Sequence, residues 1–154
     1  MEQNNVFDFK EFRKKKFEDR TKAVELYHFG DTAETVHWYI RALDAEDLAI
    51  VDESVRKNNS LLEMTDLFIK AVTEDSSVKD KSSAIKEITG LSEKVPESLV
   101  KQYAVFEQGS IEPNKPGGRA DTVKFAKTYP LHFIRIVNEI YALTRLGGLA
   151  KKKP

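Results

Sequence analysis

The stretch VHWYIRALDAED, residues 36–47, changes its pattern halfway along and thereby decides the fold. In its first half every second side chain is apolar, which places Val36, Trp38 and Ile40 on one face of a half-buried strand. In its second half Asp44 can cap a helix, and the acidic residues that follow favour the positive end of the helix dipole. We therefore predict a strand that leads directly into a helix.

A second strand is predicted just before this one. Val24 and Leu26 share one face and Tyr27 lies on the other. Residues 30–34, between the two runs, have the length and the chemistry of a hairpin loop. The sequence therefore predicts a β-hairpin near the N-terminus.

The rest of the chain has the apolar spacing of helices. After Asp44 an apolar stripe ends at Asn58 and Asn59, and the capping box at residues 60–63 predicts a new helix. Pro130 suits the first turn of the last helix. Further helices are predicted over residues 84–89, 96–106, 121–129 and 130–146.

These elements predict a mainly α fold, a compact helical domain of about five to six helices with an N-terminal β-hairpin. A chain of 154 residues has the usual size of one domain. We predict a Phe/Lys-rich arm over residues 1–20, a single mainly helical domain over residues 21–148, and a basic C-terminal tail over residues 149–154.

Composition removes several classes of function. The chain has no Cys, which excludes disulfides, thiolate nucleophiles and cysteine-bound metals, and a reducing cytoplasm is the simplest compartment for it. No apolar run approaches the roughly 20 residues of a membrane span. Lys plus Arg and Asp plus Glu both number 25, so the net charge is zero. This balance disfavours nucleic-acid binding and removes the repulsion between copies that opposes self-association.

No set of residues suited to catalysis or to a cofactor emerges. The three histidines lack the spacing of a metal motif, and we interpret His28 and His37 as packing partners in the hairpin. Helix capping and a solvated face account for the carboxylates between Asp44 and Glu53. Residues 115–119, KPGGR, lack the Gly-Lys-Ser/Thr ending of a phosphate loop. We predict a protein that is not an enzyme and uses no metal or cofactor.

The N-terminal arm interleaves aromatic and basic side chains. Phenylalanines stand beside the basic run at residues 13–16, and such a mixture makes an adaptable protein-binding surface. Nucleic-acid contact through the basic run and core packing of the phenylalanines are the alternatives. The predicted protein-binding residues are Phe7, Phe9, Phe12, Phe17, Trp38 and Tyr141.

Two stretches together resemble the tail assembly chaperones of long-tailed bacteriophages. Residues 36–47 are similar to that family's strand, Arg-x-Leu segment, small residue and acidic helix start. Residues 125–130, FAKTYP, and 140–148, IYALTRLGG, are similar to its ending, in which a helix, a Pro and a final amphipathic helix with a Leu-Thr pair precede Gly. The order and spacing of these motifs extend over most of the chain.

The resemblance implies a non-enzymatic role in phage tail assembly. Proteins of this family coat and solubilise the helical tape-measure protein, help to recruit the major tail protein while the tube polymerises, and leave the finished tail. It further implies self-association, a location in the host cell cytoplasm and absence from the mature virion. In this family a ribosomal frameshift also yields a longer product that recruits the major tail protein. Residues 151–153, KKK, are compatible with a slippery codon run, and a solubilising tail explains them equally well.

Two other functions remain open from the sequence. The chain can be a structural or adaptor component that stays in a phage particle, in which case purified virions contain it. A small helical nucleic-acid-binding protein is the weaker alternative, and it requires salt-sensitive affinity.

Overall fold

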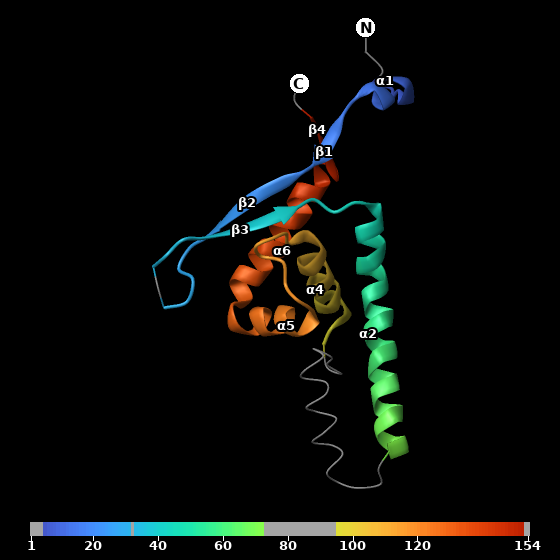
Figure 1. The fold of residues 1–154 in the computed structure, drawn as a ribbon, viewed down its shortest axis with the longest axis vertical. Coiled ribbons are helices and arrows are strands. Elements are labelled where there is room, and N and C mark those ends of the chain that lie inside the picture. The colour runs from blue at the N-terminus through green and yellow to red at the C-terminus, as the bar shows by residue number, and fades with distance from the viewer. Residues whose placement is uncertain (1–4, 32, 73–94, 153–154) are drawn as a thin grey trace.

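The computed structural model describes residues 5–31, 33–72 and 95–152, with the backbone alone for residues 68–72. In this part of the chain the fold is mainly α, with five helices and an antiparallel strand pair near the N-terminus, which confirms the predicted fold class (Figure 1). The elements in chain order are α1 (Phe9–Lys14), β1 (Phe17–Asp19), β2 (Thr21–Leu26), β3 (Val36–Arg41), α2 (Ala45–Val72), α4 (Glu97–Gly109), α5 (Arg119–Thr128), α6 (Pro130–Arg145) and β4 (Leu149–Lys151). The helix expected at residues 84–89 lies outside the described residues.

Strands β2 and β3 form the predicted hairpin, with Val24 opposite Trp38 and Glu25 opposite His37. Val24 and Leu26 are buried, as the alternation predicts. The connection runs from residue 27 to residue 35 and is longer than the predicted loop. His37 lies opposite Glu25, and His28, whose backbone is in the left-handed region (φ 55°), lies beyond the last paired residue, so the predicted cross-strand packing of His28 with His37 is wrong. Instead the Nε2 of His37 lies 3.6 Å from an Oε1 of Glu25.

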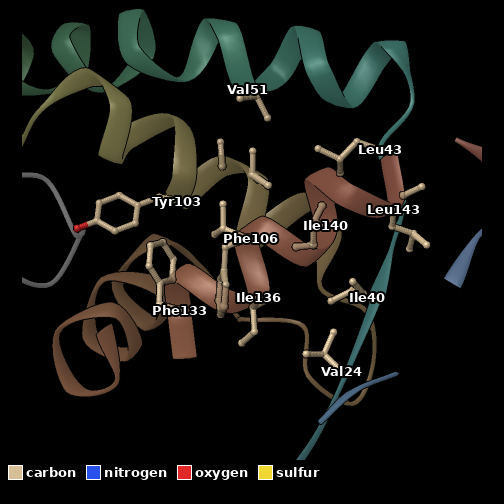
Figure 2. Close-up of a cluster of buried hydrophobic side chains, with 14 of the residues drawn as sticks. Val24, Ile40, Leu43, Val51, Tyr103, Phe106, Phe133, Ile136, Ile140 and Leu143 are labelled. Atoms are coloured by element: carbon tan, nitrogen blue, oxygen red, sulfur yellow. The ribbon is translucent and has the colours of Figure 1, made fainter. Parts of the chain in front are cut away.

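The hydrophobic core surrounds α6, which packs on the β2–β3 sheet and against α4 and α5, while α2 lies along α4 (Figure 1). Buried side chains from these elements meet in one cluster (Figure 2). Helices α4 and α6 cross so closely at Gly109 that a Cβ there would lie 2.5 Å from the Cδ1 of Ile140. Pro130 opens α6 as predicted, and Gly147, at φ 111°, follows its end. The principal buried residues are Leu26, Ile40, Leu43, Val105, Phe106, Phe133, Ile136, Val137 and Ile140.

The predicted helix break at Asn58 and Asn59 is wrong, because α2 continues through both residues. Asn58 is buried on the same face as Val51 and Ser54. Asn and Ser are mediocre helix formers, yet the packing of α2 against α4 outweighs a propensity cost of about 0.5 kcal/mol per residue. The capping box predicted at residues 60–63 therefore lies inside the helix.

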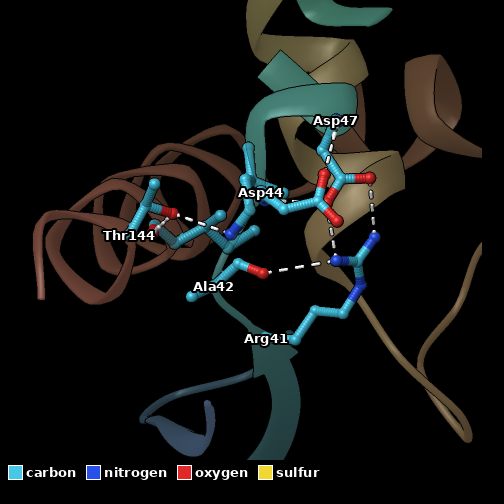
Figure 3. A network of polar contacts seen from close by, with 7 residues as sticks. Arg41, Ala42, Asp44, Asp47 and Thr144 are labelled. Carbon is cyan, nitrogen blue, oxygen red and sulfur yellow. Dashed lines mark hydrogen bonds and ion pairs between the residues drawn. The ribbon is translucent and has the colours of Figure 1, made fainter. Parts of the chain in front are cut away.

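A polar joint connects β3, α2 and α6, and Figure 3 shows its contacts. The carboxylate of Asp47 accepts two hydrogen bonds from the guanidinium of Arg41, at 2.7 and 2.9 Å. Asp44 and Asp47 each accept a hydrogen bond from the other's backbone N–H, at 2.8 and 3.0 Å, and together they cap α2. The hydroxyl of Thr144 accepts the backbone N–H of Leu43 at 3.0 Å. The strand-to-helix transition predicted from residues 36–47 is thus confirmed and held by these bonds.

Candidate protein-binding surface

Four of the predicted binding residues, Phe7, Phe9, Phe12 and Phe17, form one aromatic group, here called the Phe cluster, in which Phe17 is half-buried and the other three are exposed. The ring centroid of Phe7 lies 5.0 Å from that of Phe9 and 5.5 Å from that of Phe12, and Phe12 lies 5.1 Å from Phe17. Phe7 is 66%, Phe9 64% and Phe12 40% exposed. Core packing, one of the alternatives for these phenylalanines, does not occur within the described residues.

Helix α1 carries two members of the Phe cluster, Phe9 and Phe12, and the other two flank it. The carboxylate of Asp8 accepts the backbone N–H of Lys10 at 2.8 Å and so caps its start. No residue of α1 is buried, because its apolar side chains contact one another and not the body. The cluster is therefore already assembled before a partner arrives, which lowers the ordering cost of binding.

Strand β1 connects the Phe cluster to the body by pairing with β4. Phe17 lies opposite Lys151 and Asp19 opposite Leu149 in an antiparallel register. The guanidinium of Arg20 holds the start of β4, since its Nε donates to the carbonyl of Gly147 at 3.0 Å and an Nη donates to that of Leu149 at 3.3 Å. The segments predicted as an N-terminal arm and a C-terminal tail thus each contain a strand, β1 and β4, and these two strands pair with each other.

The charge around the Phe cluster is positive. From residue 5 to residue 17 there are five basic side chains and two acidic ones, a net charge of +3. One ion pair joins Lys14 to Glu11 at 3.2 Å, and both side chains are largely exposed. An aromatic patch with a basic margin suits a partner that offers apolar side chains flanked by carboxylates.

Trp38 and Tyr141, the other two predicted binding residues, lie apart from the Phe cluster. Trp38 packs on Phe106 and Phe125, with ring centroids 5.4 and 4.9 Å away, and its indole N–H donates to the hydroxyl of Ser110 at 2.9 Å. Tyr141 is half-buried against the core, and this burial raises the pKa of its phenol. Both side chains support the fold in this structure, and neither extends the exposed aromatic surface.

A concave surface, separate from the Phe cluster, lies between α2, α4 and the loop before α5. Its volume is about 860 Å³, and ten of its fifteen lining residues are polar or charged, with Ile50 and Leu61 among the apolar members. At one wall Arg119 and Glu107 form a bidentate ion pair, with nitrogen–oxygen distances of 2.9 Å. The lining contains no histidine, and the carboxylate of Glu107 is bound to Arg119, so we assign no reaction to this groove.

Sequence reasoning missed the role of Arg20. A pairing between residues 17–19 and 149–151 leaves no mark in either segment, because each is only three residues long and neither alternates clearly. In the sequence, the glycine pair at 147 and 148 is the signal that could have indicated a close approach of two chain segments here. Gly148 lies so close to the backbone of Leu43 that a Cβ would be 3.2 Å from that carbonyl oxygen, which points to a tight chain crossing.

In the described part of the chain, no three His, Asp or Glu side chains are grouped to hold a metal ion, and no helix is long and apolar enough to cross a membrane. Comparison of the sequence and structure with family models, curated proteins and solved structures finds no match.

Proposed function

We propose that this protein is a tail assembly chaperone of a long-tailed bacteriophage, which binds and solubilises the tape-measure protein and acts without catalysis. One observation carries the proposal: the Phe cluster is assembled, exposed and separate from the core. The resemblance of residues 36–47 and 125–148 to that family supplies the identity of the partner. On this proposal the chaperone is located in the host cell cytoplasm and is absent from the mature virion.

The chemistry of the partner follows from the surface. A long helical tape-measure chain exposes apolar stripes that aggregate unless another protein covers them. Aromatic rings at 5–6 Å spacing can insert into such a stripe, while the basic margin at residues 13–16 contacts acidic side chains beside it. Binding that relies on a few exposed rings is reversible, as release from a finished tail requires.

The position of β4 suits recruitment of the major tail protein. β4 pairs with β1, with Lys151 opposite Phe17, so β4 lies beside the Phe cluster. Figure 1 shows β4 and α1 at the same end of the molecule. A frameshift product with an added C-terminal domain would place that domain at the same end of the molecule. The tape-measure protein and the major tail protein would then be held close together.

Co-expression with the tape-measure protein of the same phage tests the proposal. We expect the tape-measure protein to be soluble with this chain and to precipitate without it. Equal solubility in both cases would contradict the proposal. Finding the chain as a regular component of purified virions would instead identify a structural or adaptor protein.

A further inference from the structure

Strands β1 and β2 behave as one extended strand whose two partners lie on the same edge. The backbone N–H of Arg20 donates to the carbonyl of Gly148 at 3.5 Å, and its C=O accepts the N–H of Ala42 at 2.8 Å. In an extended strand the N–H and C=O of one residue point to the same side. β4 and β3 therefore follow one another along a single edge of the strand from Phe17 to Leu26.

The alternation of hydrogen-bonded residues along β1 and β2 identifies which of their backbone groups point away from β4 and β3. Tyr39 lies opposite Ala23, yet its backbone bonds to Ile111 and Asn114 and thus points away from β2. Even-numbered residues of β1 and β2 consequently bond to β4 and β3, and odd-numbered residues direct their N–H and C=O outward. Within the described residues no hydrogen bond uses the backbone of these outward residues, which are Phe17, Asp19, Thr21, Ala23 and Glu25.

This free edge is long and open. It extends from Phe17 to Glu25, about 30 Å at about 3.3 Å per residue. Asp19, Thr21, Ala23 and Glu25 are all exposed, so no described element lies over it. The edge of β3, by contrast, is covered by residues 110–114, which bond to Tyr39. The edge contains no Pro, Gly or bulge, three of the features that prevent strand pairing. It does carry charged side chains, a fourth such feature, so a second strand can pair here only in a register that matches opposite charges.

We propose that two copies of this chain associate by antiparallel pairing of their free edges about a two-fold axis at Arg20. This register places Glu18 opposite Lys22 of the second copy, and the same pairing recurs across the axis. The ammonium of Lys22 also contacts the carboxylate of Glu139 in its own chain at 2.7 Å, so in the dimer it lies between two carboxylates. The register also places Asp19 opposite Thr21 of the second copy and sets the ring of Phe17 over the small side chain of its Ala23. Four free residues on each copy gain backbone partners.

Charge excludes the neighbouring registers. An axis at Thr21 places Arg20 opposite Lys22 of the second copy twice. An axis at Asp19 gains two pairs between Glu18 and Arg20, but it places Asp19 opposite itself and sets Lys16 against Lys22 twice. An axis at Lys22 opposes two ammonium groups and sets Asp19 against Glu25. In the proposed register the two Arg20 side chains do not repel strongly, because each guanidinium is bound to the carbonyls of Gly147 and Leu149 at the opposite edge.

Sedimentation velocity between about 10 μM and 1 mM tests the pairing. The wild type is expected to form a dimer as concentration rises. Ala23→Pro removes an outward N–H and leaves the ladder with β3, which uses Lys22 and Val24, so it should raise the dimer Kd about tenfold or more with an unchanged circular dichroism spectrum. A wild type that stays monomeric over this range overturns the proposal, and so does a folded Ala23→Pro variant with the wild-type Kd.

Cross-linking tests the register even if Ala23→Pro fails to fold. The chain has no Cys, so Asp19→Cys and Thr21→Cys each introduce a single thiol. Mixed under oxidation, the two variants should form a mixed disulfide dimer, because paired residues lie about 5.5 Å apart. Each variant alone should remain uncross-linked, since its own thiols lie beyond the about 7 Å limit. Equal cross-linking of the mixture and of each variant alone contradicts this register. These tests use no tape-measure protein and leave α1 intact, so their failure is distinct from failure of the proposed function.

Discussion

The backbone N–H of Leu43 donates to the hydroxyl of Thr144 at 3.0 Å, although the two residues are 101 positions apart. The same hydroxyl donates to the carbonyl of Ile140 within α6 at 2.7 Å. Leu43 and Thr144 belong to the two stretches that carry the family resemblance, so these stretches meet in one joint of the fold. Their sequence pattern is therefore accounted for by folding, and the candidate binding surface lies elsewhere, on α1 and β1.

Thr144→Val keeps the shape of the side chain and removes its hydrogen bonds. The N–H of Leu43 then loses its acceptor in a partly buried site, which should lower the free energy of unfolding by about 1–3 kcal/mol. Urea denaturation at constant m-value measures the change. Thr128→Val is the matched control, because its hydroxyl bonds only to Lys124 at an exposed position. Equal effects of the two substitutions would contradict the role given to this joint.

Asp47 should make stability depend on pH. The hydrogen bonds from Arg41 hold the pKa of this carboxyl below its ordinary value of 3.8, despite the opposing effect of burial. A lowered folded-state pKa means that the contribution is complete at neutral pH, begins to fall as pH approaches 3.8, and is lost below the folded-state pKa. Unfolding free energies between pH 7 and pH 3 should show this loss in the wild type.

Asp47→Asn separates this effect from general acid destabilisation. The variant should lose about 1–3 kcal/mol at pH 7 and then decline less than the wild type on acidification. Glu46→Gln, at an exposed neighbouring position of the same helix turn, serves as the control. Parallel pH profiles for the wild type and Asp47→Asn would show that the pair with Arg41 does not couple stability to pH.

Gly109→Ala should destabilise the contact between α4 and α6. Its new Cβ would lie 2.5–2.8 Å from three side-chain carbons of Ile140, and overpacking of this kind costs about 1–3 kcal/mol. The gain in helix propensity, about 1 kcal/mol, offsets only part of this cost. Gly118→Ala is the control, because nothing lies within 4 Å of the added Cβ. Thermal unfolding measures the midpoint temperature of both variants. Equal midpoints for Gly109→Ala and Gly118→Ala would show that α4 and α6 move apart readily to accept the added Cβ.

Much of this fold follows from sequence because its signals are local. The alternation at Val24 and Trp38, the cap at Asp44 and the helix boundary at Pro130 each depend on a few neighbouring residues. The continuity of α2 through Asn58 does not, since it depends on packing against α4. The pairing of β1 with β4 joins residues far apart in the chain and was likewise beyond local reasoning.

Part of the candidate surface was also predicted from the sequence, because its signals are local. The phenylalanines of α1 are close in sequence, and their clustering needs only one helical turn and a short strand. Trp38 was also predicted to be a binding residue, but it packs against the core. Its position on the inner face of β3, beside Phe106, depends on how the sheet meets α4.

Trp38 and Phe9 should therefore respond oppositely to substitution. Trp38→Phe loses the hydrogen bond to Ser110 and should cost about 1–2 kcal/mol of stability, with tape-measure binding unchanged. Phe9→Ser should weaken binding and leave stability within about 0.5 kcal/mol, because its ring is 64% exposed. Denaturation curves and binding titrations on the same two proteins check this reciprocity. A loss of binding in a folded Trp38→Phe variant would show that Trp38 belongs to the binding surface.

The most direct test of the account is a titration of the tape-measure protein with wild-type chain and with Phe7→Ser/Phe9→Ser/Phe12→Ser. The matched control, Met64→Ser/Leu67→Ser/Leu131→Ser, removes three apolar side chains of similar exposure from α2 and α6. We predict that the triple Phe variant raises Kd about 100-fold or more, while the control stays within about threefold of the wild type. A triple Phe variant that binds as tightly as the wild type would contradict the claim that this surface holds the tape-measure protein.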